Sequence, residues 1–171
     1  MVLEEKLFAL GKPCFYIIQT DRDAFQNLEL RLTQLNKNVV VRMIRGKKSR
    51  TTQKFFDEIA AALQFPYYFG ENWNAFDECI IDLDWIEGDA YLLIVSNANM
   101  LLSDADKKDL DTLLHTLERA NEEWLTPNEY IPRDRQPTPF HVLLQCGVAD
   151  ALTLVERLTD FHIAFELLED R

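Results

Sequence analysis

Residues 65–85 read FPYYFGENWNAFDECIIDLDW, and this stretch decides how the middle of the chain folds. Pro66 stiffens a loop that carries three consecutive aromatic residues, 67–69. Asn72 is placed to cap the N-terminus of a helix, and Gly70 permits a tight turn just before it. The pattern therefore predicts an aromatic loop that leads directly into a helix over residues 73–83.

This helix has two chemically different faces. Successive helical residues turn by about 100°, which places four apolar residues beside Trp73 as a core stripe: Phe76, Cys79, Ile80 and Leu83. The opposite face receives Asn74, Asp77, Glu78, Asp82 and Asp84. Ile81 falls in the middle of that acidic face, and Trp85 joins it if the helix continues. We expect Ile81 to be exposed and surrounded by carboxylates.

An apolar residue surrounded by polar ones is typical of the centre of a small interface. The alternative is that another part of the same chain, such as the segment from residue 149, covers Ile81. Rigid aromatic rings beside a helix end also suit binding, because they lose little freedom on association. We expect at least one ring of residues 67–69 to be buried instead. The candidate partner-binding residues are Tyr67, Tyr68, Asn72, Asn74, Asp77, Glu78, Ile81, Asp82 and Trp85.

Strand and helix patterns alternate along the rest of the chain. The predicted strands cover residues 15–19, 39–44, 91–95, 140–145 and, as an edge strand, 162–168. The predicted helices follow Asp21 and cover residues 51–63, 73–83, 103–124 and 149–158, with a capping box expected at Ser103. This alternation predicts an α/β fold with a mostly parallel central sheet flanked by helices.

The charge balance limits the classes of partner. The net charge of −11 lacks the basic footprint of a nucleic-acid-binding protein, so we expect no direct nucleic-acid contact and, if there is a partner, a basic one. Residues 30–56 hold eight Lys or Arg and no acid, whereas residues 55–106 hold eleven Asp or Glu and no base. One explanation is that the fold has a basic and an acidic solvated face that attract each other. The other is that a single acidic surface is dedicated to a partner.

Two other functional classes remain open. The basic run Arg42, Arg45, Lys47, Lys48, Arg50 and Lys54 suggests a regulatory or scaffold module that docks on the acidic helix of a second copy. Arg42 lies within a predicted strand, so this run need not form one patch. Asp77, Glu78 and Asp82 suggest a metal-dependent hydrolase. No glycine-rich phosphate loop or His-Glu-x-x-His pair accompanies them, and the three histidines are scattered, so we expect no enzyme activity, no metal and no cofactor.

The cysteines and the N-terminus indicate a cytoplasmic protein. Cys14, Cys79 and Cys146 are an odd, widely spaced set, which favours reduced buried thiols over a disulfide framework. The first residues lack the basic and apolar regions of a signal peptide, and no apolar run approaches the roughly 20 residues of a membrane span. We therefore expect no membrane contact, and a monomer.

Residues 66–75 resemble the barstar family, the intracellular inhibitors of secreted bacterial ribonucleases. The family carries a Pro-x-Tyr-Tyr/Phe-Gly-x-Asn-x-Asp-Ala segment that leads into an acidic helix. The matching positions here are Pro66, Tyr68, Phe69, Gly70, Asn72 and Ala75. The resemblance covers about residues 38–146, and the length of 171 residues predicts one domain over 1–171. In it, 1–37 is an added strand-helix unit and 147–171 an added C-terminal segment.

The resemblance implies a mechanism. Loop and helix enter the active-site cleft of a barnase-type ribonuclease or another basic nuclease toxin, where carboxylates take the places of RNA phosphates. It makes Tyr68 the loop aromatic and puts Glu78 in place of the family's principal carboxylate. Asn74 stands where the family usually has Asp, and Asp77 where its namesake has an aromatic residue, which points to a changed target. Candidates for a further acidic contact in the following helix are Glu118, Glu122 and Glu123.

Overall fold

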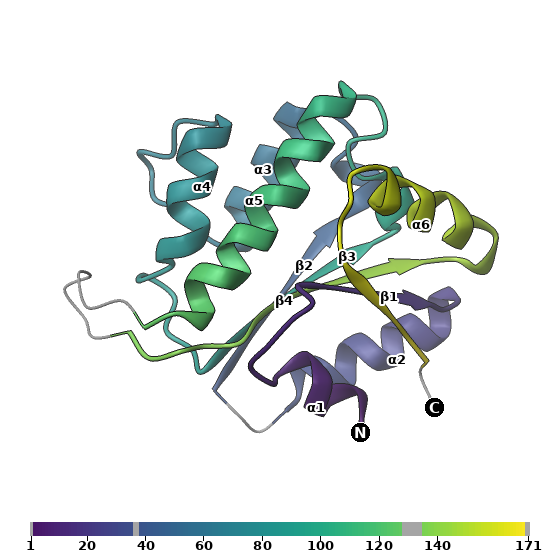
Figure 1. Cartoon of the computed structure of the whole chain (residues 1–171), viewed down its shortest axis with the longest axis horizontal. Helices are drawn as coiled ribbons and strands as arrows, with labels where there is room; N and C mark the ends of the chain where they lie inside the picture. Colours follow the sequence, from purple (N-terminus) through teal and green to yellow (C-terminus); the bar gives the residue numbers. More distant parts are fainter. Residues whose placement is uncertain (1, 36–37, 128–134, 170–171) are drawn as a thin grey trace.

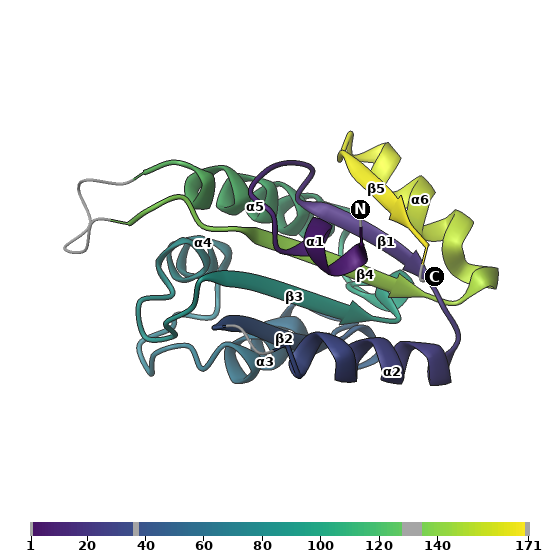
Figure 2. The same ribbon diagram turned by 90° about the horizontal axis from the view of Figure 1, so that it is seen from below.

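Five short apolar segments pair into a single sheet. They are β1 (Phe15–Gln19), β2 (Val39–Arg45), β3 (Ala90–Ser96), β4 (Phe140–Cys146) and β5 (Phe165–Leu168). The strand order is β2-β3-β4-β1-β5, and all pairings between these strands are parallel (Figure 2). β3 and β4 are buried almost throughout, as expected for inner strands with both faces covered. The predicted α/β fold with a mostly parallel sheet is confirmed.

Helices cover both faces of this sheet (Figure 1). The computed structural model describes residues 2–35, 38–127 and 135–169. Its helices are α1 (Leu3–Leu7), α2 (Arg22–Thr33), α3 (Thr52–Ala62), α4 (Trp73–Asp82), α5 (Lys107–Leu125) and α6 (Ala151–Asp160). Short 3-10 turns lie at η1 (Gly46–Lys48), η2 (Ala98–Met100) and η3 (Val148–Asp150). In Figure 1, α1 and α2 lie below the strands, and α3, α4 and α5 lie above them.

Alternate strand residues feed two hydrophobic clusters. Helices α3, α4, α5 and α6 pack on one face, where Phe15, Leu93 and Val142 point. Helices α1 and α2 pack on the other, where Ile94 and Leu143 point. The segment before β2 therefore supplies both a strand, β1, and the cover for the second face of the sheet.

Some boundaries differ from the sequence prediction. The helix expected from residue 103 begins at Lys107, because the Asp106 side chain, and not Ser103, caps it by accepting from the Lys108 backbone N–H. β5 begins three residues later than expected, after His162 in a left-handed conformation (φ 57°). Helix α1 was not predicted from its five residues. The cysteines Cys14, Cys79 and Cys146 are all free and buried, as expected.

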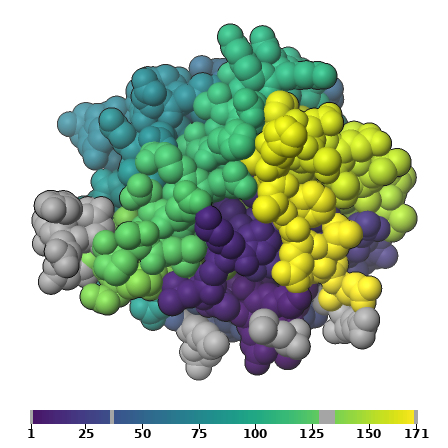
Figure 3. All heavy atoms as spheres, in the orientation of Figure 1, coloured from purple at the N-terminus to yellow at the C-terminus, as the bar shows by residue number. Residues whose placement is uncertain are grey.

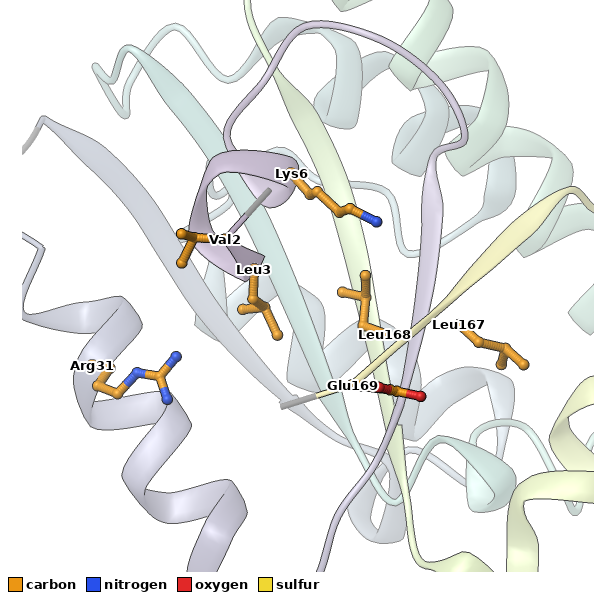
Figure 4. Close-up of a pocket in the computed structure, with 7 residues that line it drawn as sticks. All are labelled: Val2, Leu3, Lys6, Arg31, Leu167, Leu168 and Glu169. Atoms are coloured by element: carbon orange, nitrogen blue, oxygen red, sulfur yellow. The ribbon is translucent and has the colours of Figure 1, made fainter. Parts of the chain in front are cut away.

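The N- and C-terminal segments lie against each other in the space-filling view (Figure 3). Lys6 of α1 pairs with Glu166 of β5. Beside this pair is a hollow of about 560 Å³, lined by Val2, Leu3, Lys6, Arg31, Leu167, Leu168 and Glu169 (Figure 4). Its core residues Leu3 and Leu168 belong to the cluster under α1 and α2, so it opens away from α4.

Candidate functional site

The aromatic residues of the loop between α3 and α4 form two sets, one packed inward and one exposed. Phe65 and Phe69 turn inward, with ring centroids 4.9 Å apart, and Phe69 also meets Phe56 of α3 at 5.8 Å. Tyr67 and Tyr68 turn outward, with 101% and 68% of their surfaces exposed. Their rings lie 5.6 Å apart at 78°, an edge-to-face pair. Of residues 67–69, only Phe69 is partly buried.

The turn before α4 is fixed by its cap. Asn72 Oδ1 accepts from the Ala75 backbone N–H at 2.9 Å, and its Nδ2 donates to the Gly70 carbonyl at 3.1 Å, which confirms the predicted N-cap. The left-handed residue of this turn is Glu71 (φ 49°), not Gly70. A Cβ at position 70 would lie 2.9 Å from Asn72 Nδ2, so a larger residue there would have to displace the capping side chain.

The first turn of α4 is anchored by Trp73. Its indole N–H donates to Asp109 of α5 at 2.9 Å, and its ring stacks on Phe55 at 5.9 Å. Phe56 and Phe76 complete an aromatic cluster around it. The start of α4 is therefore held by both α3 and α5.

Side chains from other segments bind the backbone carbonyls at the C-terminal end of α4. Leu83 adopts a left-handed conformation (φ 46°) and ends it. Trp124 of α5 donates its indole N–H to the Ile80 carbonyl at 3.0 Å, and Arg135 donates to the Ile81 carbonyl. The Arg135 guanidinium lies 4.0 Å from the centroid of the Trp124 ring, and burial lowers its pKa. These partners satisfy the carbonyls that a helix end leaves free.

Two residues of the predicted acidic face do not lie where the helical pattern placed them. Ile81 is half-buried against the main cluster, so the expected exposed apolar centre is wrong. Its carbonyl is bound by Arg135, from the segment before β4 and not the segment from residue 149. Trp85 lies beyond the end of α4, donates its indole N–H to the Leu63 carbonyl at 2.9 Å, and packs edge-on to Phe65.

The acidic residues of α4 also separate into two groups. Asp77 is half-buried and bound to Arg119 of α5, whose Nε donates to Oδ1 at 3.1 Å. The hydrogen bond to Asp77 raises the pKa of Arg119. A second carboxylate, that of Glu123, lies 3.7 Å from Nη1 of the same guanidinium. Sequence reasoning missed Arg119, because it lies 42 positions from Asp77 and no local sequence pattern predicts a contact between residues so far apart.

The outward carboxylates are fewer than predicted. Glu78 and Asn74 are exposed, and no ion pair from the described residues reaches Glu78. Asp82 is half-buried, and burial, followed by the nearby Asp84, raises its pKa. Burial raises the pKa of Cys79 in the same helix. Glu78 and Asp84 are thus the exposed carboxylates of the predicted acidic face that no ion pair from the described residues reaches. The carboxylates near the tyrosine pair are Asp82 and Asp84, whose charges add to the effect of burial in raising the pKa of Tyr68.

The three glutamates proposed on α5 have different partners. Glu123 flanks Arg119 on the side of α4. Glu122 pairs with Lys12, and Glu118 lies 3.3 Å from His115 Nδ1. Glu123 is therefore the member of the set that the structure brings beside α4.

The basic run is divided by internal pairs. Arg45 binds Glu58 at 2.7 Å, Arg50 binds Asp104 at 2.9 Å, and Arg42 is half-buried in β2. Lys47, Lys48 and Lys54 stay exposed. In the part of the chain that the structure describes, no cluster of three or more His, Cys, Asp or Glu could hold a metal ion. None of its helices is long and apolar enough to cross a bilayer.

The fold and this surface define the chain as a parallel α/β protein that exposes a tyrosine pair beside an acidic helix. The family model described as Barstar (barnase inhibitor) matches residues 39–145, almost the range expected from the sequence motif. The chain belongs to the barstar family.

Solved structures share the wider fold at low sequence identity. The ORC2 protein of Aeropyrum pernix in its ADP form is 15% identical, with a TM-score of 0.58 over 93% of this chain. Cdc6p of Pyrobaculum aerophilum is 14% identical, with a TM-score of 0.53 over 90% of this chain. The chain covers only 43% and 38% of those two proteins, so the likeness concerns the fold alone. A comparison with curated proteins finds no match.

Proposed function

We propose that this protein is a non-enzymatic, immunity-type inhibitor that blocks the active site of a basic ribonuclease or a related nuclease toxin. The observation that carries the proposal is the exposed pair Tyr67 and Tyr68, on the loop that leads into α4 and close to the carboxylates of Asp82 and Asp84. Glu78, in the same helix, is exposed and has no ion pair from the described residues. Two adjacent exposed tyrosines and an exposed acid suit a surface that becomes buried on association.

The binding surface is pre-organised. Phe65 and Phe69 fix the base of the loop in the core, and the Asn72 cap fixes its junction with α4. Such a loop has little conformational freedom to lose when a partner binds, which leaves more of the contact energy for affinity.

Electrostatics favour a basic cleft. An exposed carboxylate forms charge-assisted hydrogen bonds with Arg, Lys or protonated His. The net charge of −11 accelerates encounter with a positively charged protein. In this proposal Tyr67, Tyr68, Asn74 and Glu78 contact the partner, and Asp82 lies at the edge of the contact.

The other predicted residues take supporting roles. Asn72, Ile81 and Trp85 hold the loop and helix in place from behind. Asp77 presents a pair with Arg119 where the family's namesake has an aromatic residue. We therefore propose that the target differs from barnase near this pair.

The region after β1 does not favour nucleotide binding. A nucleotide-binding α/β protein needs a glycine-rich loop between such a strand and its helix. Here Thr20 and Asp21 alone separate β1 from α2, and Asp21 caps the helix by accepting from the Ala24 N–H at 2.9 Å. We propose a cytoplasmic location on the basis of the three buried free thiols.

Calorimetric titration with barnase-type ribonucleases tests the proposal. We expect 1:1 binding that weakens as salt is raised and that abolishes RNA cleavage. If none of these enzymes binds, and a pull-down with the nucleases of the native genome is also empty, the inhibitor function is wrong. Mass measurement at low salt tests the self-docking alternative, which requires a dimer or larger assembly.

A further inference from the structure

A second hollow, of about 390 Å³, lies between α5, the segment before β1 and the start of β5. It takes no part in the proposed inhibitory surface. Its polar residues are Lys12, Glu118, Asn121 and Glu122, and its apolar residues include Pro13 and Phe165. Hollows of this size fall within the range that holds small organic ligands, about 300–1,000 Å³.

The buried side chain of Asn121 forms part of this hollow with one polar atom unused. Asn121 is only 1% exposed, and its Nδ2 donates to the Phe140 carbonyl at 2.8 Å and the Gly11 carbonyl at 3.3 Å. Both acceptors are carbonyl oxygens, so the amide cannot be flipped. Asn121 lines the hollow, and no hydrogen bond from the described residues reaches its Oδ1, so this oxygen is free to accept one from a ligand.

The charges around the hollow favour a cation. Two carboxylates, Glu118 and Glu122, face a single ammonium group, that of Lys12, which is bound to Glu122. The hollow therefore has one more negative than positive group. The thiol of Cys14, which also lines the hollow, donates its hydrogen bond to the Leu117 carbonyl at 3.4 Å and so does not donate to a ligand.

We propose that this hollow binds a small organic amine with an apolar tail. The ammonium group donates to Asn121 Oδ1 and to the carboxylate of Glu118. The alkyl tail lies against Phe165 and Pro13, which removes apolar surface from water. An anion of the same size would face two carboxylates, and a neutral alcohol would leave the excess negative charge unpaired.

The proposal is tested with two probes that differ in one group. Pentylamine is a monocation at pH 7, and 1-pentanol has the same length without the charge. We expect pentylamine to saturate a single site in an NMR titration, shifting the backbone amides of Ala164, Phe165 and Asn121. We expect 1-pentanol to bind at least about tenfold more weakly.

Two matched variants of α5 separate this site from general attraction to an acidic protein. Glu118→Gln keeps the shape of the side chain and should weaken pentylamine about tenfold. Glu123→Gln removes the same charge from the same helix, but beside Arg119, and should leave the affinity unchanged. Equal binding of alcohol and amine, equal effects of both variants, or shifts centred on α4 would overturn the proposal. These outcomes do not depend on whether the protein inhibits a nuclease.

Discussion

Trp73 and Asp109 join the first turns of α4 and α5 through one hydrogen bond of 2.9 Å. The second oxygen of the same carboxylate accepts from the Thr52 hydroxyl, in the first turn of α3, at 3.0 Å. Three helix N-termini therefore share Asp109, whose negative charge also suits their partial positive charges. The position of the acidic helix depends on this residue.

Asp109→Ala should lower the free energy of unfolding by about 1–3 kcal/mol, because it leaves two half-buried donors without their acceptor. Urea denaturation measures this change. Asp111→Ala, on the same helix but paired with the exposed His115 alone among the described residues, should cost less than about 0.5 kcal/mol. Similar costs for both variants would show that Asp109 does not join the helices.

Charge reversal at Glu78 should separate binding from stability. Glu78→Lys places a cation at the centre of the proposed surface and should weaken a basic nuclease at least about tenfold, with unfolding unchanged. Glu156→Lys makes the same charge change at an exposed position on α6 and should have little effect on affinity. Calorimetric titration of both variants with the nuclease measures the two affinities. Equal losses of affinity would show that the binding surface does not include Glu78.

The pair of Asp77 and Arg119 should contribute little to folding. Both side chains are partly exposed, by 34% and 43%, so a double-mutant cycle should give a coupling free energy below about 1 kcal/mol. Arg119→Ala should then make Asp77 available and change the affinity for basic nucleases more than the stability. A coupling of several kcal/mol would mean that the pair is structural.

His141 should make the protein less stable in mild acid. Its ring lies beside the Leu7 and Gly11 carbonyls, and burial lowers its pKa below the ordinary 6.5. The unfolded chain therefore takes up a proton near pH 6.5 that the folded protein does not, so stability is full above this pH and falls below it. The slope from this residue cannot exceed about 1.4 kcal/mol per pH unit.

Urea denaturation at pH 7.5 and 5.5 tests this sign. The difference between the two values should shrink in His141→Gln and persist in His115→Gln, since His115 is exposed on α5. A variant of His141 with the full acid sensitivity of the parent would assign the effect to other groups.

The added N-terminal unit should be required for folding. β1 lies between β4 and β5, and α1 and α2 cover Ile94 and Leu143. A fragment of residues 38–146 would expose these side chains, and we expect it to lack dispersed NMR signals. Ile18→Ala in the whole chain should cost about 2–5 kcal/mol. A folded fragment would show that the family region is independent.

Local patterns predicted the sheet because the inner strands are rich in apolar residues, and they predicted the Asn72 cap because capping involves neighbours in sequence. They failed at Ile81, which lies inside α4 and packs against the main cluster, because a helical projection does not show which side of a helix other segments cover. They failed at Trp85 for a different reason. A helical projection contains no information on where the helix ends, and Leu83 ends it by a left-handed conformation that few leucines adopt. The contacts from Arg119, Trp124 and Arg135 come from distant segments, which only the fold brings to α4.

The placement of β1 has a consequence for how the chain reaches its native state. Phe15 of β1 pairs in register with Val142 of β4, near the other end of the sequence. The chain must close a very long loop before this pairing forms, and such distant contacts slow folding. During synthesis, β1 cannot pair until most of the chain has left the ribosome, although both of its faces are buried in the folded sheet. We therefore expect a slow folding phase and a nascent chain that relies on chaperones.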